Sequence, residues 1–407
     1  MRLPRLTMLG ALAAVALAAP RALDAQVAVK AAKLYTMAGP MVEDGVVVIR
    51  DGRIVAVGQA SAITVPDGYR VLECAVATPG LIDARSVVGL AGQYNIPHDQ
   101  DQLETSAPIQ PALRALDAYN ARERLVAWVR SFGVTTLHTG HAPGELISGQ
   151  TLIVKTREGT VDDALVEPVA MLAATLSSDA RKASGSPGTR GKMMALLRAK
   201  LVEAQGYRDK KAAAKDGEAP PVQLDLEALV EVLERRVPLL VTAHREQDLS
   251  SALRLAREFG IRVVLDGAAE AYLLLDEIRE AGVPVILHAP MARSIGDLEN
   301  ASFETAAKLR RAGILFALES GYESYVPKTR VVLFEAAIAA ANGLSFDEAL
   351  AAITADAARI LEIDDRVGSI AVGKDGDVAL FDGDPFEYTT HCVGTVIQGE
   401  VVSDAKR

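Results

Sequence analysis

The sequence has 407 residues, of which 50% are hydrophobic and 24% are charged, so the chain can bury a large core and is not intrinsically disordered. Its formal net charge of −10 argues against nucleic acid as a partner, because phosphate binding requires a basic surface. Two cysteines exclude a disulfide scaffold and a cysteine-rich metal site.

Residues 1–25 have the composition of a secretory signal peptide. Arg2 and Arg5 give a positive start, and residues 6–19 form a run rich in Ala and Leu that is short for a membrane span. Ala25 offers a small residue at the cleavage point. We therefore expect an exported protein, periplasmic or extracellular, with no integral membrane segment after signal cleavage. An uncleaved membrane anchor is the alternative.

Both ends of the mature chain are rich in strand patterns, which are β-branched runs separated by turn residues. These runs are residues 46–50, 54–57, 378–382 and 395–398. We predict a composite β-sandwich built from residues 26–75 and 356–407. Cys74 and Cys392 fall within these two segments, where a disulfide and a pair of buried free thiols are both open interpretations.

Between these ends, residues 76–355 alternate short apolar runs with helix-patterned stretches. The apolar runs are residues 78–84, 134–140, 237–244, 261–267, 283–289 and 314–320, with weaker runs at 152–156 and 169–174. Strand and helix patterns that alternate in this way favour a parallel sheet, and eight such strands close into a (β/α)8 TIM-like barrel. Residues 177–220 are polar and interrupt the alternation, which predicts an excursion on the barrel rim.

Four stretches between residues 46 and 385 carry a resemblance to a known family that covers essentially the whole mature chain. They are VVVIRDGRIVAVG (46–58), ATPGLIDA (77–84), the segment from VTAHREQ to AAEAY (241–272) and the segment from GLSFDEAL to LFDGDP (343–385). The sequence resembles the amidohydrolase superfamily in its imidazolonepropionase- and prolidase-like branch. The resemblance implies an α/β fold, a metal-dependent-hydrolase barrel with a composite β-sandwich. It also implies hydrolysis of C–N bonds, such as those of a cyclic amide or a small peptide.

The resemblance further implies one or two divalent metal ions, which turn a bound water into hydroxide. The family's ligands are a His-x-His after the first strand, a carboxylated Lys or Glu on the fourth, His on the fifth and sixth, and Asp on the eighth. His244 matches the fifth-strand histidine. The first pair falls on Arg85 and Val87 or, shifted by one residue, on Ala84 and Ser86, and neither register supplies a nitrogen ligand.

The other ligand positions also depart from the family pattern. The fourth-strand region has no Lys, and Glu167 lies at its beginning rather than its end. The sixth-strand histidine is absent near Gly267, and only Glu319 can substitute for the eighth-strand acid. The sequence therefore predicts a degenerate metal site.

Four histidines follow the predicted strands and offer a replacement site. They are His138, His141, His244 and His288, and the candidate carboxylates at the same rim are Asp266, Glu270 and Glu319. A barrel brings the carboxyl ends of its strands to one mouth, where three imidazoles around one ion make a zinc set with an open position. We therefore expect either one divalent metal, with zinc as the first choice, or none. Ordinary rim histidines are the alternative.

Arg85 and Lys155 are the candidate substrate-binding residues. Lys155 is expected at the rim, where a lysine meets an acidic substrate or pairs with Glu145. An ordinary salt-bridged or exposed lysine is the other interpretation of Lys155. For Arg85 the preferred interpretation is structural, a buried ion pair with Asp83 that fills the former metal pocket.

The sequence leaves three functions open. The first is an exported hydrolase of C–N bonds with a reduced metal site, in which His244 and Glu319 are catalytic. The second is a catalytically inactive protein of the same fold that binds a small molecule or a partner. The third is metal-free acid–base chemistry by His244 with Glu319 or Asp266. The partner is expected to be a small-molecule or peptide-like substrate, while its identity and the oligomeric state stay open.

Overall fold

A computed structural model describes residues 26–94, 96–215, 219–323 and 330–407. The predicted signal peptide lies outside the described residues. The strands form three sheets, of seven, six and four strands. In the described part of the chain, no helix is long and apolar enough to cross a membrane.

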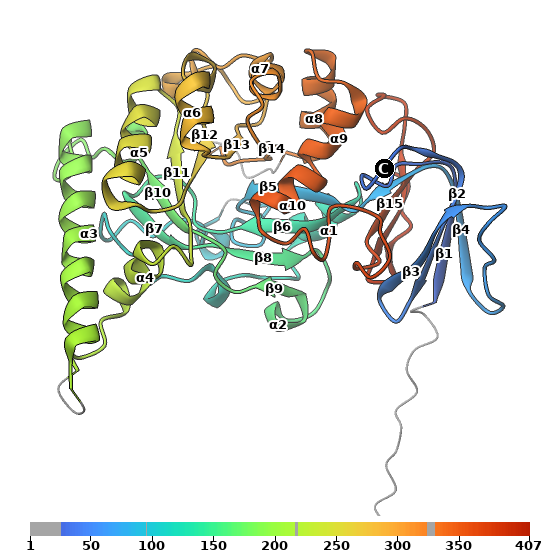
Figure 1. Ribbon diagram of the computed structural model, residues 1–407, viewed down its shortest axis with the longest axis horizontal. Helices are drawn as coiled ribbons and strands as arrows, with labels where there is room; N and C mark the ends of the chain where they lie inside the picture. The colour runs from blue at the N-terminus through green and yellow to red at the C-terminus, as the bar shows by residue number, and fades with distance from the viewer. Residues whose placement is uncertain (1–25, 95, 216–218, 324–329) are drawn as a thin grey trace, which may run out of the picture.

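The seven-stranded sheet combines strands from both ends of the chain, and it lies beside the rest of the molecule in Figure 1. Its strands, in spatial order, are β17 (Glu400–Ser403), β16 (Cys392–Ile397), β15 (Val378–Phe381), β4 (Arg70–Pro79), β1 (Val27–Leu34), β2 (Val42–Arg50) and β3 (Arg53–Gln59). The N- and C-terminal strands meet where β15 pairs antiparallel to β4. The expected joining of the two ends is therefore present, with the strands hydrogen-bonded in one sheet. Cys74 and Cys392 are both free thiols.

The other two sheets curve around a common interior. The four-stranded sheet runs β5 (Leu81–Ser86), β6 (Val134–Thr139), β8 (Leu152–Lys155) and β9 (Leu165–Glu167). The six-stranded sheet runs β14 (Phe316–Leu318), β13 (Val285–Leu287), β12 (Val263–Gly267), β11 (Leu239–Ala243), β10 (Leu172–Thr175) and β7 (Ile147–Gln150). Strands β10 to β14 are parallel, as the alternating sequence pattern predicted.

The arrangement is TIM-barrel-like, but it departs from a regular (β/α)8 barrel in two ways. Strands β7 and β8, separated only by Thr151, run antiparallel to β10 and β6. Only residues 140–146 connect β6 to β7, too few for the dozen or more that a parallel crossover needs. The two sheets also meet through isolated contacts rather than continuous ladders, such as the bridge between Ser86 and Gly321.

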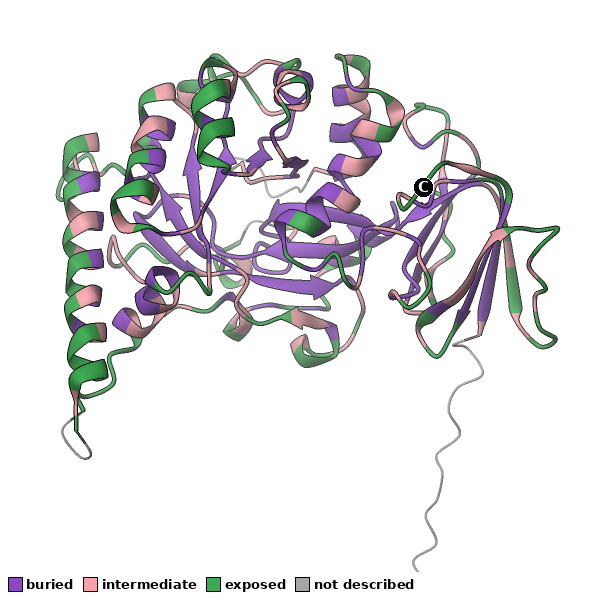
Figure 2. Cartoon of the chain, in the orientation of Figure 1, coloured by how far each residue is buried: buried purple, intermediate pink, exposed green. Residues whose placement is uncertain are grey.

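Helices cover the outside of the six-stranded sheet and close one end of the interior (Figure 1). The α-helices are α1 (Arg124–Arg130), α2 (Val161–Ala164), α3 (Arg190–Ala213), α4 (Leu224–Leu233), α5 (Glu246–Phe259), α6 (Leu275–Ala281), α7 (Thr305–Arg311), α8 (Val332–Ala341), α9 (Phe346–Ala352) and α10 (Ala355–Ile360). Short 3-10 helices are Pro97–Asp99, Ala115–Asp117, Ser178–Ala180, Ala271–Leu273 and Gly296–Leu298. Figure 2 shows that the strands of the two curved sheets are mostly buried, while α3, from the predicted rim excursion, has one exposed side.

The interior of the two curved sheets is filled by one apolar layer. Its strand residues are Ile82, Ile153, Leu240, Val264, Ile286 and Ala317, and α10 adds Ala357, Ala358 and Ile360 from below. Because side chains alternate between the two faces of a strand, the residue two positions further along faces the same interior. Polar residues nearer the carboxyl ends of the same strands therefore face the interior directly above this apolar layer.

Candidate active site

The polar residues above the apolar layer come from four neighbouring strands. Leu240, Val264, Ile286 and Ala317 are followed two positions later by Thr242, Asp266, His288 and Glu319. All four of these polar side chains are buried and line one cavity, which also includes Arg85 and His244. The cavity has a volume of about 60 Å³ and lies at the carboxyl ends of the strands, where barrel enzymes carry their chemistry.

The two histidines in the cavity are both held as neutral imidazoles. Burial lowers the pKa of His288 to about 4, and its Nδ1 donates to the carbonyl of Ala289 at 2.9 Å, which leaves Nε2 as a bare acceptor. Burial also lowers the pKa of His244, against the attraction of Asp266. The Nε2 of His288 and the Nδ1 of His244 are buried and have no hydrogen-bond partner among the described residues.

Two carboxyl groups face these imidazoles. The hydroxyl of Thr242 donates to one oxygen of Asp266, and a side-chain hydrogen bond joins Asp266 to Glu319. Burial and the charge of Asp266 raise the pKa of Glu319 well above its ordinary value. The remaining oxygens, Oδ1 of Asp266 and Oε2 of Glu319, find no partner in the described part of the chain.

Arg85 and Asp83 lie beside this carboxyl pair, but they are not joined by their side chains. The Asp83 carboxylate accepts from the backbone N–H of Ser320 at 2.9 Å and, more weakly, from that of Arg85 at 3.4 Å. The Arg85 guanidinium donates to the carbonyls of Ser86, at 3.1 Å, and of His141. The preferred interpretation of Arg85, a side-chain ion pair with Asp83, is therefore wrong. Arg85 is buried with its charge facing the cavity, and no carboxylate among the described residues lies within ion-pair distance.

The structure separates the other two candidate histidines from the cavity. His138 is fully buried, with Nδ1 at 2.7 Å from the carbonyl of Ala84 and Nε2 at 2.7 Å from the hydroxyl of Thr151. Both of its nitrogens are used in joining neighbouring strands. The ring of His141 packs against Gly149, where an added Cβ would approach it to 2.6 Å. Neither residue lines the cavity, so the prediction that four histidines share one mouth is corrected to two.

Lys155 is likewise outside the cavity. It is 3% exposed, and its Nζ is ion-paired with Asp377 and, at 3.2 Å, with Asp375. These acids precede β15, so the pair connects the barrel to the seven-stranded sheet. The expected partner Glu145 is instead ion-paired with Lys182, in the rim excursion. Strand β8 runs antiparallel to its neighbours, and this reversal places Lys155 at the opposite end of the barrel from the cavity.

Glu270, a predicted rim carboxylate, holds the loops above the cavity. It accepts from Arg245 at 3.0 Å, from Asn300 at 2.6 Å and from the backbone N–H of Glu246 at 2.6 Å. Arg245, next to His244, also binds Glu299 at 2.7 Å. Both carboxylate oxygens of Glu270 accept hydrogen bonds. Glu270 therefore holds the loop after β13 over His244 and does not line the cavity.

The residues present do not fit the family's metal centre. Within the described ranges, no group of three or more His, Cys, Asp or Glu side chains is placed to hold an ion. Gly267, at the end of β12, occupies the position of the family's sixth-strand histidine. It has φ +78°, and a Cβ there would lie 2.4 Å from Cε1 of His244. The sixth-strand ligand position therefore has no room for a side chain while His244 occupies its present place. We derive no catalytic step through a metal.

Sequence reasoning found His244, His288, Asp266 and Glu319 but missed Thr242, which fixes the orientation of Asp266. The alternation of side chains along a strand could have predicted Thr242, because Thr242, like Asp266, lies two positions after an inward-facing aliphatic residue. Glu167 lies before β10, at the opposite end of the strand from the cavity, as its sequence position predicted.

Comparison with known proteins agrees with this architecture. A model of the amidohydrolase family matches residues 235–403. Imidazolonepropionase from Stenotrophomonas maltophilia is 28% identical over 383 residues, covering 84% of this chain and 87% of that protein. Imidazolonepropionase from Rhizobium rhizogenes is 22% identical over 370 residues, with 84% and 87% covered.

Solved structures extend the likeness to the fold. An amidohydrolase from Thermotoga maritima superposes with a TM-score of 0.88 and 26% identity, covering 93% of this chain and all of that one. An adenosine deaminase from Xanthomonas campestris with bound zinc has a TM-score of 0.53 at 16% identity, covering 92% of each chain, and it shows the fold alone. The fold is thus that of a TIM-barrel-like hydrolase. These likenesses together support the amidohydrolase superfamily, in its imidazolonepropionase-like branch.

Proposed function

We propose that this chain is a hydrolase of C–N bonds in small cyclic amides, with His244 as the base and Glu319 as the acid. One observation carries the proposal. His244 and Glu319 line one cavity, and each has a buried atom without a hydrogen-bond partner among the residues that the structure describes. Buried polar atoms are normally hydrogen-bonded, so unpaired ones at a cavity are a signature of a ligand site.

Burial disfavours charge on both groups. It lowers the pKa of His244, which favours the neutral imidazole, and it raises the pKa of Glu319 well above its ordinary value, which favours the protonated carboxyl. A base without a proton beside an acid that still holds one is the pairing that amide hydrolysis requires. The relatives named imidazolonepropionase support a cyclic amide as the substrate class.

Arg85 supplies a fixed positive charge to this cavity. Its guanidinium is anchored by two backbone carbonyls rather than by a carboxylate, so its charge remains available to a ligand. An amide carbonyl that develops negative charge during hydrolysis is stabilised by a preorganised cation or donor. We propose that Arg85 performs this task at the position where relatives of the superfamily place their first metal ligands.

The reaction then follows from the groups at hand. His244 accepts a proton from water as the water oxygen bonds to the amide carbon, and Arg85 faces the resulting oxyanion. The C–N bond breaks as Glu319 gives its proton to the leaving nitrogen. The proton held by His244 returns to Glu319 through solvent, which restores both groups and balances the addition of one water.

The test is hydrolysis of a panel of cyclic amides, namely hydantoin, dihydrouracil and an imidazolone, by the wild type, His244→Ala and Glu319→Gln. Loss of a general base or acid lowers kcat by about 10²- to 10⁴-fold. His98→Ala is the matched control, because His98 is exposed and does not line the cavity. Equal turnover in His244→Ala and the wild type would refute the assignment.

A second function, ligand binding without turnover, is favoured by one observation. The cavity of about 60 Å³ is smaller than the about 300 Å³ or more typical of small-molecule sites, and loops tied by Arg245 cover it. If none of the cyclic amides is hydrolysed but one raises the thermal midpoint of the wild type and not of Arg85→Met, binding is the function.

We also propose that the mature protein is exported and starts after Ala25, and that its barrel closes as a (β/α)8-type unit over residues 76–355. The charged start and apolar run of residues 1–25 support export. N-terminal sequencing of protein recovered from the periplasm tests the cleavage. A chain that retains Met1 and sediments with membranes would contradict it.

A further inference from the structure

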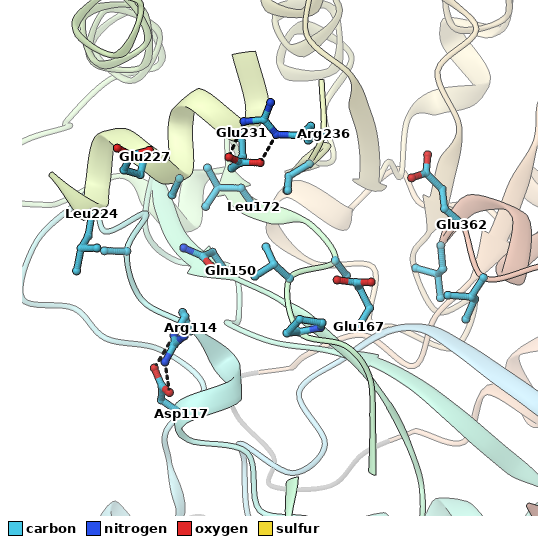
Figure 3. A pocket seen from close by; sticks show the side chains of 18 residues that line it. Arg114, Asp117, Gln150, Glu167, Leu172, Leu224, Glu227, Glu231, Arg236 and Glu362 are labelled. Carbon is cyan, nitrogen blue, oxygen red and sulfur yellow. Dashed lines mark hydrogen bonds and ion pairs between the residues drawn. The ribbon is translucent and has the colours of Figure 1, made fainter. Parts of the chain in front are cut away.

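A second and larger pocket lies at the opposite end of the barrel from the candidate active site. It has a volume of about 930 Å³, which falls within the range of small-molecule sites. It is bounded by α4, by the segment before β10 and by the turn after α10 (Figure 3). Val237 of this pocket precedes β11, whereas His244 follows it, so the strand separates the two cavities by about 20 Å.

The pocket has an apolar floor with one strongly exposed edge. Leu172, Leu361 and Ile363 are buried in the floor, and Val169 lies partly buried among them. Leu224, at the start of α4, is 69% exposed beside them. An exposed leucine next to an open apolar floor leaves apolar area that a ligand's hydrocarbon body can cover.

The charges around the pocket are almost entirely paired. Arg114 binds both oxygens of Asp117, at 2.9 and 2.6 Å, and Arg236 binds both oxygens of Glu231, at 2.5 and 2.7 Å. These are the two pairs drawn with dashed lines in Figure 3. Neither arginine is therefore left to attract an anion.

Two of the three remaining carboxylates are paired with cations outside the pocket. Lys211 binds Glu227 at 2.6 Å, and Arg262 binds Glu362 at 2.6 Å. Glu167 differs, because its carboxylate has no hydrogen bond or ion pair with any residue that the structure describes. Figure 3 shows Glu167 and Leu224 on opposite sides of the pocket, with Leu172 and Gln150 between them.

We propose that this pocket binds a small molecule with an apolar body and one protonated amine. The amine pairs with Glu167, and the body covers Leu172 and Leu224. The pocket should prefer a positively charged ligand, because Glu167 is unpaired beside an apolar floor while the other charged side chains that line the pocket already have partners. The site is separate from the proposed hydrolase centre, and its test does not depend on turnover.

Three probes of one shape and different charge test the proposal. They are 3-phenylpropylamine, 3-phenylpropan-1-ol and 3-phenylpropanoate, titrated into the full chain by isothermal calorimetry up to about 10 mM. The amine is expected to bind about threefold to fivefold more tightly than the alcohol, as for one partly exposed ion pair, and the acid more weakly than both. Equal affinities, or no binding of the amine, would overturn the proposal.

Variants locate the site. Glu167→Gln is expected to remove the preference for the amine, while Glu362→Gln, the matched control whose carboxylate is already held by Arg262, keeps it. Ala228→Trp, which fills the pocket from α4, should abolish binding of all three probes, and its circular dichroism and thermal midpoint report whether it folds. An unchanged preference in Glu167→Gln would place the amine elsewhere and overturn the assignment, whether or not Ala228→Trp folds.

Discussion

The carboxyl groups of Asp266 and Glu319 share a hydrogen bond at the carboxyl ends of β12 and β14, which flank β13 in the sheet. Only one of two touching buried carboxyls can ionise readily, because like charges repel strongly where water is excluded. The hydroxyl of Thr242 donates to Asp266, while burial and the charge of Asp266 raise the pKa of Glu319 well above its ordinary value. This raised pKa makes Glu319 the candidate acid of the cavity.

The pH dependence of turnover tests the roles of His244 as base and Glu319 as acid. The productive state needs neutral His244 and protonated Glu319. Because the pKa of His244 is lowered from 6.5, kcat/KM should rise on the acid side with a midpoint below 6.5. Because the pKa of Glu319 is raised well above 4.5, the fall on the alkaline side should come far above that value. A profile with its acid midpoint at or above 6.5 would show that His244 is not held neutral by burial.

Arg85 is predicted to affect the rate more than the stability of the protein. Arg85→Met removes the charge that faces the cavity, and kcat should fall about 10²- to 10³-fold, as for loss of one oxyanion donor. Arg85→Lys should recover part of the rate, since it restores the charge without the planar geometry. Arg208→Met, on the outer part of α3, is the control. If Arg85→Met turns over like the wild type, the guanidinium has no part in catalysis.

The buried lysine between the barrel and the seven-stranded sheet is predicted to be a stability element. Lys155→Met leaves Asp377 and Asp375 buried without this cation, and breaking such a pair costs about 3–5 kcal/mol of unfolding free energy. Urea unfolding followed by circular dichroism measures the loss. The exposed pair Arg114–Asp117 serves as the comparison, because Arg114→Ala should cost no more than about 1 kcal/mol. Equal losses in the two variants would contradict the structural role of Lys155.

Asp83 is predicted to make the folded state less stable as the pH rises. Burial raises its pKa from 3.8 to about 7, so between these values the folded chain holds one proton more than the unfolded chain. The unfolding free energy should therefore fall with rising pH in this window, by about 1.4 kcal/mol per pH unit from this group. The stabilising contribution of Asp83 to the unfolding free energy is therefore fully present below about pH 4 and is lost as the pH rises through about 7.

Asp83→Asn should flatten that slope, because the amide oxygen can still accept from the backbone N–H of Ser320 but does not titrate. Urea unfolding at several pH values between 4 and 7.5 gives the slope for each protein. Asp117→Asn, at an exposed position, is the control. A slope that Asp83→Asn leaves unchanged would mean that Asp83 is ionised in the folded state.

Much of this fold follows from local patterns in the sequence. The runs at 237–244, 261–267 and 283–289 became parallel strands because each is short, apolar and separated from the next by a helix that ends at glycine. The run at 152–156 has the same composition but is antiparallel. Its direction is set by the short connection from β6, which a hydrophobicity pattern does not encode.

The location of a site residue could be predicted from the sequence where it follows from the residue's position on a strand. It could not be predicted where it depends on which side chain is its hydrogen-bond or ion-pair partner. His244, Asp266, His288 and Glu319 lie at strand ends, so the sequence placed them together. His138 also lies on a strand, but its ring binds Thr151 across the sheet, a contact between strands whose pairing the sequence did not reveal. Lys155 was misplaced for the same reason, since its partner Asp377 is 222 residues away in the chain.

The most direct test of the central claim is hydrolysis of the cyclic amide panel by protein stripped of metal with a chelator, with metal content measured by elemental mass spectrometry. The account predicts less than about 0.1 ion per chain and turnover that persists in the chelator and disappears in His244→Ala. About one zinc per chain, with turnover lost on stripping and restored by zinc, would contradict it.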